Sequence, residues 1–277
     1  QFAYVSENLY VIEANPRASR TVPFVSKATG VQMAKAAVLI GLGKSIADLK
    51  AEGYLPSNMD GASLPEETAI AVKAAVLPFA RFRTPEGVVV DSLLSPEMRS
   101  TGEVMGLDKH YDTAFAKAQA GAGSPLPTSG KVFISVANHD KRNVIIYAKM
   151  LESLGFEIVS TGGTAEILRR NGLNSVIVAS KFAEANGDHS IVDMVRNGDI
   201  DLILNTPAGG AARSDGYEIR AAAVSVGCPV MTTISEFAAA VQAINALREH
   251  SWDIMSLQEH GVQLAAAVDA RSEGGEA

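Results

Sequence analysis

The sequence contains a single cysteine and no long hydrophobic run, and these absences exclude several classes of protein. One thiol, Cys228, cannot form an internal disulfide, and its apolar context, VSVGCPVM, predicts a small buried side chain. No apolar run approaches the ~20 residues that span a bilayer. The first residues also lack the basic and apolar regions of a secretion signal. We therefore expect a soluble, cytoplasmic protein with no membrane partner.

An excess of positive charge is also missing. The 24 lysine and arginine residues are outnumbered by 31 aspartate and glutamate residues, which gives a net charge of -7. A chain of this charge is not expected to have a broadly basic face, so we expect no nucleic-acid partner. A local cationic pocket for a phosphate group is compatible with this balance.

Length and local pattern predict two domains and indicate a fragment of a longer protein. The chain has 277 residues, which favours two domains over one. The first residues, QFAYV, have the pattern of a strand with no leader or cap before them, which indicates that the chain begins inside a domain. A turn signal at residues 6–8 predicts a hairpin over residues 1–15. Further along, residues 26–49 alternate helical stretches with Gly breaks, and residues 95–106 are rich in turn formers.

A linker divides the sequence. The stretch GAGSPLPTSG combines Gly, Ser and Pro without apolar periodicity. After it, five short apolar strands alternate with helices, which is typical of a parallel sheet covered on both faces. We predict an α/β chain with a first part over residues 1–122 and a linker over residues 123–130. A doubly wound, mainly parallel five-stranded domain follows over residues 131–269, and residues 270–277 form a disordered tail.

The strand LYVIEAN carries polar residues with the spacing of a metal site. Glu13 and Asn15 are two residues apart, so a strand presents them on one face. A hairpin turn centred on residues 7–8 would bring Gln1 close to opposite Glu13. Three oxygen ligands without His or Cys suit Mg²⁺ or Mn²⁺, and Arg17, with Arg20 beyond it, would meet a transferred phosphate. The alternative is a solvated strand face.

One glycine-rich stretch is not a phosphate loop. GLGKS, residues 41–45, resembles half of that motif. The full pattern requires Gly five residues before Gly43, and Val38 stands there. We predict a helix end instead.

The stretch STGGTAE, residues 160–166, follows an expected strand and opens an expected helix. Two glycines permit close backbone approach, and the free amides of a helix N-terminus attract anions. The other strand ends would converge on the same edge. The candidate phosphate-binding residues are therefore Lys141, Thr161, Thr164, Lys181 and Asn205. The alternatives are a tight turn with Thr164 as the N-cap, and two lysines on the solvated surface.

Three stretches resemble the carbamoyl phosphate synthetase large-subunit family. They are VIEANPRASRTVPFVSKATG, VLPF (76–79) and SPEMRSTGEVMG (95–106), and the resemblance covers essentially the whole chain. It implies the end of the second ATP-grasp module followed by a regulatory domain of the methylglyoxal-synthase-like fold. It also implies that Gln1, Glu13 and Asn15 are metal ligands in an ATP-dependent ligase site, and that Arg17 contacts phosphate as a catalytic residue.

By the same resemblance, the second domain binds nucleotide effectors such as UMP and IMP through Lys141, Thr161, Thr164, Lys181 and Asn205. The implied partners are the rest of the large subunit and a small glutaminase subunit. The implied pathways are pyrimidine and arginine synthesis.

Some positions depart from the family pattern. Pro207 stands where some relatives have a threonine, so one hydroxyl contact to the effector is lost. Ala74 and Val230 stand where the ornithine site of some members has a glutamate and a tyrosine. We therefore expect weak or absent activation by ornithine.

Two other functions remain open at this stage. A methylglyoxal synthase acting on dihydroxyacetone phosphate needs a carboxylate base beside the phosphate site, and NGDHSIVD offers Asp188 beside His189. A non-catalytic interaction module, with an incidental phosphate pocket, is the third interpretation.

Overall fold

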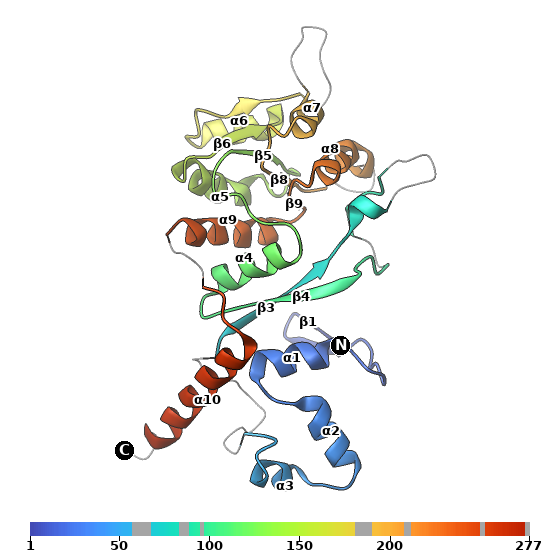
Figure 1. The fold of residues 1–277 in the computed structure, drawn as a ribbon. Coiled ribbons are helices and arrows are strands. Elements are labelled where there is room, and N and C mark those ends of the chain that lie inside the picture. The colour runs from blue at the N-terminus through green and yellow to red at the C-terminus, as the bar shows by residue number, and fades with distance from the viewer. Residues whose placement is uncertain are drawn as a thin grey trace. The chain divides into compact units, whose positions relative to one another are not determined.

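The structure, a computed structural model of the chain, describes residues 1–56, 68–82, 89–94, 97–180, 190–207, 212–249 and 253–274. The chain forms two compact units. The first combines Gln1–Ala69 with Ile254–Ala277, and the second is Ile70–Asp253. In Figure 1 the first unit carries the blue and the last red segments, and the second carries the intervening colours.

The first unit begins with the predicted hairpin. Strand β1 (Phe2–Val5) pairs antiparallel with β2 (Asn8–Val11). The turn consists of Ser6 and Glu7, both with positive φ, as a two-residue hairpin turn of the mirror-image type requires. The predicted turn position is therefore wrong by one residue, because Asn8 already belongs to the second strand.

In its described residues, the first unit also contains four helices: α1 (Thr21–Thr29), α2 (Met33–Gly41), α3 (Ile46–Ala51) and α10 (Leu257–Gly274). Gly30 ends α1 in the left-handed conformation, which glycine adopts without strain. Ser45 and Asp48 form a reciprocal capping box at the start of α3. GLGKS thus joins the end of one helix to the cap of the next, as predicted. Helix α10 extends into the stretch predicted as a disordered tail, and residues 275–277 lie outside the described residues.

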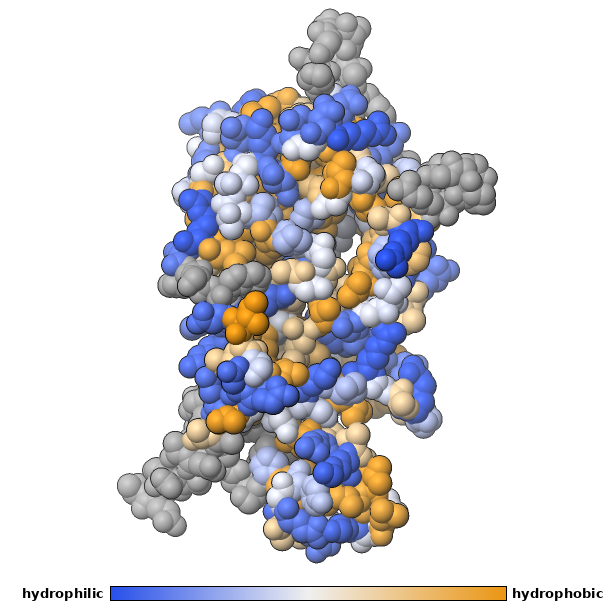
Figure 2. All heavy atoms as spheres, viewed as in Figure 1, coloured by the Kyte–Doolittle hydropathy of each residue, from blue (hydrophilic) through white to orange (hydrophobic). Residues whose placement is uncertain are grey.

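Apolar side chains are widely exposed in this unit. Most residues of the hairpin are exposed, including Phe2, Tyr4, Leu9 and Val11. Three aliphatic residues near the end of α2 are exposed as well: Val38, Ile40 and Leu42. Figure 2 shows hydrophobic residues gathered on one side of the lobe that contains α2 and α3.

The second unit opens with an antiparallel pair and a helix. Strand β3 (Ile70–Val76) pairs with β4 (Gly102–Asp108), and the short 3₁₀ helix η1 (Phe79–Arg81) follows β3. Helix α4 (Tyr111–Gly121) packs against both strands. The turn-rich stretch predicted over residues 95–106 ends in a strand, which starts at Gly102, because cross-strand pairing with β3 overrides its local preference.

The predicted parallel sheet is confirmed. Its order is β7-β6-β5-β8-β9, and every pairing is parallel. The strands are β5 (Lys131–Ser135), β6 (Glu157–Ser160), β7 (Ile177–Val178), β8 (Leu202–Asn205) and β9 (Val230–Met231). The helices are α5 (Lys141–Ser153), α6 (Gly162–Arg170), α7 (Ile191–Arg196), α8 (Ala212–Val226) and α9 (Ile234–Glu249).

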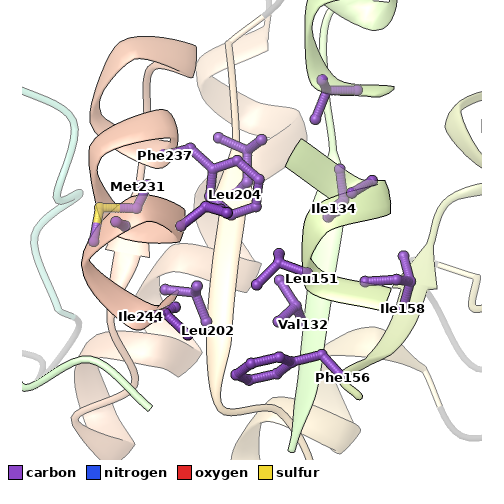
Figure 3. Packing of buried hydrophobic residues seen from close by; sticks show 14 of the residues in the cluster. Val132, Ile134, Leu151, Phe156, Ile158, Leu202, Leu204, Met231, Phe237 and Ile244 are labelled. Carbon is purple, nitrogen blue, oxygen red and sulfur yellow. The ribbon is translucent and has the colours of Figure 1, made fainter. Parts of the chain in front are cut away.

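The two faces of this sheet carry two separate hydrophobic clusters. Successive residues of a strand point to opposite faces. Val132 and Ile134 therefore join the cluster under α5, α6 and α9, whereas Phe133 joins the cluster under α7 and α8. Figure 3 shows Val132, Ile134, Leu151, Leu202 and Phe237 packed together in the first of these. A Leu-to-Ala change in such a core typically lowers the free energy of unfolding by about 2–5 kcal/mol. The packed sheet therefore holds the loops at its edge in fixed positions.

The predicted linker lies inside the second unit. Helix α4, which precedes it, packs on α9, which follows it. Phe115 and Ala116 of α4 and Leu126 within the linker are buried in the same cluster as the sheet. Domain boundaries at residues 122 and 131 remain a prediction, and the compact units divide the chain elsewhere.

Cys228 packs against the second cluster, beside Val230. It is half-buried, and burial, with Asp201 nearby, raises the pKa of its thiol to about 12. Such a thiol carries almost no thiolate at neutral pH and behaves as a small hydrophobic residue. In the part of the chain that the structure describes, no helix combines the length and the apolar character needed to traverse a bilayer.

Candidate functional sites

The carboxyl ends of three neighbouring strands form the first candidate site. Strands β5, β6 and β8 end at Ser135, Ser160 and Asn205, and Thr161 follows β6 directly. The hydroxyl oxygens of Ser135 and Thr161 lie 3.2 Å apart, and the Asn205 Nδ2 group donates to the Ser135 carbonyl at 3.4 Å. Because parallel strands end at one edge, these polar groups meet although they are distant in sequence.

Two threonine hydroxyls at this edge are oriented by backbone amides. The Val136 N–H donates to Thr164 Oγ1 at 3.4 Å, and the Ala137 N–H donates to Thr206 Oγ1 at 2.8 Å. Both threonines are buried. A hydroxyl that accepts from an N–H keeps its own proton to donate. The two side chains are therefore suited to donate hydrogen bonds to an anion.

Helix α6 begins at the same edge. Its N-cap is Thr161, with extended backbone and no side-chain capping hydrogen bond, so the interpretation of Thr164 as the N-cap is wrong. The first amides of any helix have no partner within the helix, and they carry its partial positive charge. Here those first positions are Gly162 and Gly163, as the motif suggested.

Lys141 adds a positive charge to this edge. It is the first residue of α5, and its ammonium group lies 3.3 Å from the position that a Cβ of Gly163 would occupy. Glycine at position 163 thus leaves room for the lysine beside the N-terminus of α6. Together, these groups form an electropositive donor-rich edge suited to a phosphate.

Some predicted residues cannot be placed. Lys181, Asp188 and His189 lie outside the described residues. Pro207, which replaces a threonine of some relatives, is exposed next to Thr206.

Sequence reasoning missed three residues that the structure brings to the site: Ser135, Thr206 and Arg220. Ser135 and Thr206 could have been found by the same rule as Asn205, because both lie at strand ends. Arg220 lies in the interior of α8 and gave no local signal. Its Nη1 donates to Asn205 Oδ1 at 2.8 Å.

The second candidate site is the end of the hairpin. Asn15 Nδ2 donates to Glu13 Oε1 at 3.0 Å, so these two side chains do lie together, and both are exposed. Gln1 stands opposite Ile12 rather than Glu13, because the turn falls one residue earlier than predicted. Its terminal amine donates to the Glu13 carbonyl at 2.7 Å. The Arg17 guanidinium donates to the neighbouring Ala18 carbonyl at 3.2 Å.

This donor set is compatible with a hard cation only in part. One carboxylate and one amide oxygen are side by side, which suits Mg²⁺ with phosphate and water completing its sphere. Over the described residues, no three His, Cys, Asp or Glu side chains converge on a metal position. The predicted set contains one such residue, Glu13.

Two family models match the chain. Residues 1–49 match the carbamoyl-phosphate synthase L chain, ATP binding domain, and residues 143–232 match the MGS-like domain. The chain is also 70% identical to the carbamoyl phosphate synthase large chain of Kocuria rhizophila over 94% of its length. The same protein of Micrococcus luteus is 64% identical over 97%, and that of Paenarthrobacter aurescens 64% over 98%.

The chain belongs to the carbamoyl phosphate synthase large chain family. It spans about a quarter of the length of these relatives, 24% to 25%. The first match covers the hairpin with Glu13 and Asn15, and the second runs from α5 to β9. The fold is therefore the end of an ATP-grasp domain followed by a doubly wound MGS-like domain, as the sequence predicted.

Proposed function

We propose that this chain is the C-terminal part of the large subunit of a glutamine-hydrolysing carbamoyl phosphate synthase. That enzyme makes carbamoyl phosphate from ATP, bicarbonate and ammonia derived from glutamine, for pyrimidine and arginine synthesis. The support is the similarity to carbamoyl phosphate synthase large chains along almost the whole chain. Its partners are the remainder of the large subunit and a small glutaminase subunit.

Within this function, we assign the edge of the parallel sheet to a nucleotide effector, with UMP and IMP as candidates. The observation that carries the assignment is the convergence of oriented hydroxyls, a lysine and a helix N-terminus on one edge. Thr161 and Thr164 donate hydroxyl protons to phosphate oxygens, and the amides of Gly162 and Gly163 donate alongside them. Lys141 supplies charge, Asn205 supplies an amide, and Lys181 is assigned by resemblance.

The hairpin is assigned to the site that phosphorylates carbamate. Glu13 and Asn15 would hold Mg²⁺ or Mn²⁺ together with the phosphates of ATP. Gln1 is proposed as the third ligand by resemblance to the family alone. When bound, the ion neutralises phosphate charge during transfer. Arg17 is exposed, and its guanidinium would exchange the contact with the Ala18 carbonyl for a phosphate oxygen.

Calorimetric titration of UMP into this chain tests the effector assignment. We expect saturable binding that inorganic phosphate and IMP weaken by competition. Thr161→Ala removes one hydroxyl, and a hydrogen bond to a charged group is worth about 1.5–3 kcal/mol, so we expect at least about 10-fold weaker binding. Thr113→Ala, on α4, is the matched control, because among the described residues the Thr113 hydroxyl forms a hydrogen bond only with the neighbouring Asp112.

Two outcomes would contradict the assignment. If neither UMP nor IMP binds the wild-type chain at millimolar concentration, the edge is not a nucleotide site. If UMP binds with equal affinity to the wild-type and Thr161→Ala chains, the nucleotide lies elsewhere.

A further inference from the structure

A completely buried arginine lies behind the sheet edge. Arg220, in the middle of α8, has no exposed surface and is among the largest fully buried side chains of the described residues. Its Nε and Nη2 groups donate to the two oxygens of Asp91, at 2.7 Å each. Its Nη1 group donates to Asn205 Oδ1 at 2.8 Å. One guanidinium thus joins an aspartate that precedes the predicted linker to an asparagine of the candidate pocket.

The charge of Arg220 explains why this arrangement is specific. A guanidinium does not lose its proton in proteins, so its burial is tolerated only with a paired and fully hydrogen-bonded partner. Asp91 supplies the charge through a two-pronged contact, which fixes the plane of the guanidinium. With the plane fixed, Nη1 lies on the side of Asn205, and one of its N–H groups donates to the Asn205 oxygen.

This direction determines how Asn205 presents its amide. A guanidinium only donates, so the amide oxygen of Asn205 must face Arg220, and the NH₂ group must face away from it. The NH₂ group lies on the side of Ser135, at the edge of the sheet, where it contacts the Ser135 carbonyl at 3.4 Å. Arg220 therefore holds Asn205 as a donor toward the candidate pocket.

The helix backbone leaves room for this network only at a glycine. A Cβ on Gly216 would lie 2.2 Å from Arg220 Nη1 and 2.3 Å from Asn205 Oδ1. The next residue, Tyr217, makes a second contact with the segment around Asp91, because its hydroxyl donates to the Val89 carbonyl at 2.6 Å. Helix α8 thus holds residues 89–94 at two points, and η1 lies against the same helix (Figure 1).

We propose that Arg220 is a positioning residue that couples the effector pocket to the segment 89–94 through Asp91. The coupling rests on the proposed function, because it assigns a regulatory path to the same pocket. A ligand that engages the Asn205 NH₂ group favours the arrangement in which Arg220 faces Asp91. Coupling between two sites is reciprocal: if a bound ligand stabilises the contact between Arg220 and Asp91, then that contact strengthens ligand binding. Loss of the Asp91 charge is therefore expected to weaken ligand binding.

The test uses Asp91→Asn, which keeps the shape of the side chain and removes its charge. The matched control is Asp108→Asn, which breaks the ion pair with Lys117 in the same unit. The two aspartate side chains are 23% and 20% exposed, respectively. We expect UMP, or inorganic phosphate as the simpler probe, to bind Asp91→Asn at least 5-fold more weakly than wild type. Binding to the control is expected to be unchanged.

Two further measurements test the network, the first without a ligand and the second with UMP. In the amide NMR spectrum, the Asn205 side-chain NH₂ signal, identified by its loss in Asn205→Asp, is expected to shift in Asp91→Asn but not in Asp108→Asn. In hydrogen exchange, the amides of Val90 and Leu93 are expected to exchange more slowly when UMP is bound. These amides bond to Phe82 O and Asp91 Oδ1.

The outcomes separate this inference from the proposed function. If the wild-type chain binds no nucleotide, the effector assignment fails, and the Asn205 signal alone decides the positioning role. An unshifted Asn205 signal in Asp91→Asn would overturn that role. Equal affinity of UMP for Asp91→Asn and wild type, or unchanged exchange at Val90 and Leu93, would overturn the coupling.

Discussion

At the scale of single residues, burial changes the chemistry of a carboxyl group on α9. Glu236 lies in the first turn of this helix, and burial raises its pKa, although the Thr232 N–H, 3.3 Å from Oε2, favours the charged form. Helix N-termini favour negative charge. Here, desolvation outweighs that effect because the helix start packs onto the core.

The raised pKa predicts a pH-dependent stability. Glu236 stabilises the fold when protonated, and this contribution is lost as the pH rises from the usual value of 4.5 through the raised folded-state pKa. Glu236→Gln keeps an acceptor for Thr232 and cannot ionise. In urea unfolding, we expect the variant to be more stable than wild type at pH 7, with a difference that shrinks toward pH 4.5. A difference that does not change with pH would contradict the explanation.

Residue-scale prediction from the sequence succeeded where a residue's role follows from its place beside a strand end. Thr161 and Asn205 were identified in this way, and the structure brings both to the edge of the sheet. Their binding of an effector remains a prediction. Arg220 was invisible because its partner Asp91 is 129 residues away, and an arginine in a helix is ordinarily a surface residue.

At the scale of elements, β4 and α4 approach each other closely at a glycine. A Cβ on Gly106 would lie 1.9 Å from the Ala114 carbonyl oxygen and 2.6 Å from the Ala118 nitrogen. Both are backbone atoms of α4, so the helix itself would have to move. The absence of a side chain at Gly106 therefore allows α4 to pack closely against β3 and β4.

Gly106→Ala is accordingly expected to destabilise the second unit. Overpacking that forces backbone shifts costs about 1–3 kcal/mol, occasionally more. The matched control is Gly41→Ala, at the end of α2, where a Cβ would meet nothing within 4 Å. Thermal unfolding followed by circular dichroism should show a lower midpoint temperature for Gly106→Ala than for wild type. The midpoint temperature of the control should be unchanged. Equal transitions would mean that α4 can shift at little cost.

Element-scale prediction depended on periodicity. The five strands of the parallel sheet have clear patterns, and all were predicted. Strand β4 was not predicted, because the turn-forming residues before it suggested a loop. The stretch becomes a strand only because it pairs with β3. The hairpin turn was misplaced by one residue, because Ser6, Glu7 and Asn8 all tolerate turns and only cross-strand pairing selects between them.

At the scale of the whole molecule, the match to an ATP binding domain covers residues 1–49 and the chain spans 24% of its Kocuria relative. A site that transfers phosphate from ATP needs groups around the whole nucleotide. We therefore expect the purified chain to make no carbamoyl phosphate from ATP, bicarbonate and ammonia, with the full-length enzyme as the positive control. Measurable synthesis by the chain alone would overturn this prediction.

The sequence alone determined the fold class of the second domain, the family and the strand-end positions of the candidate pocket. These features follow from short-range spacing: apolar runs of strand length, Gly-rich helix starts and contiguous family stretches. The tertiary structure decided the register of the hairpin, the packing of α4 on α9 across the predicted linker, and the junction of Asp91, Arg220 and Asn205. Those depend on contacts between residues far apart in the chain, and no local pattern encodes which distant partner completes a buried charge.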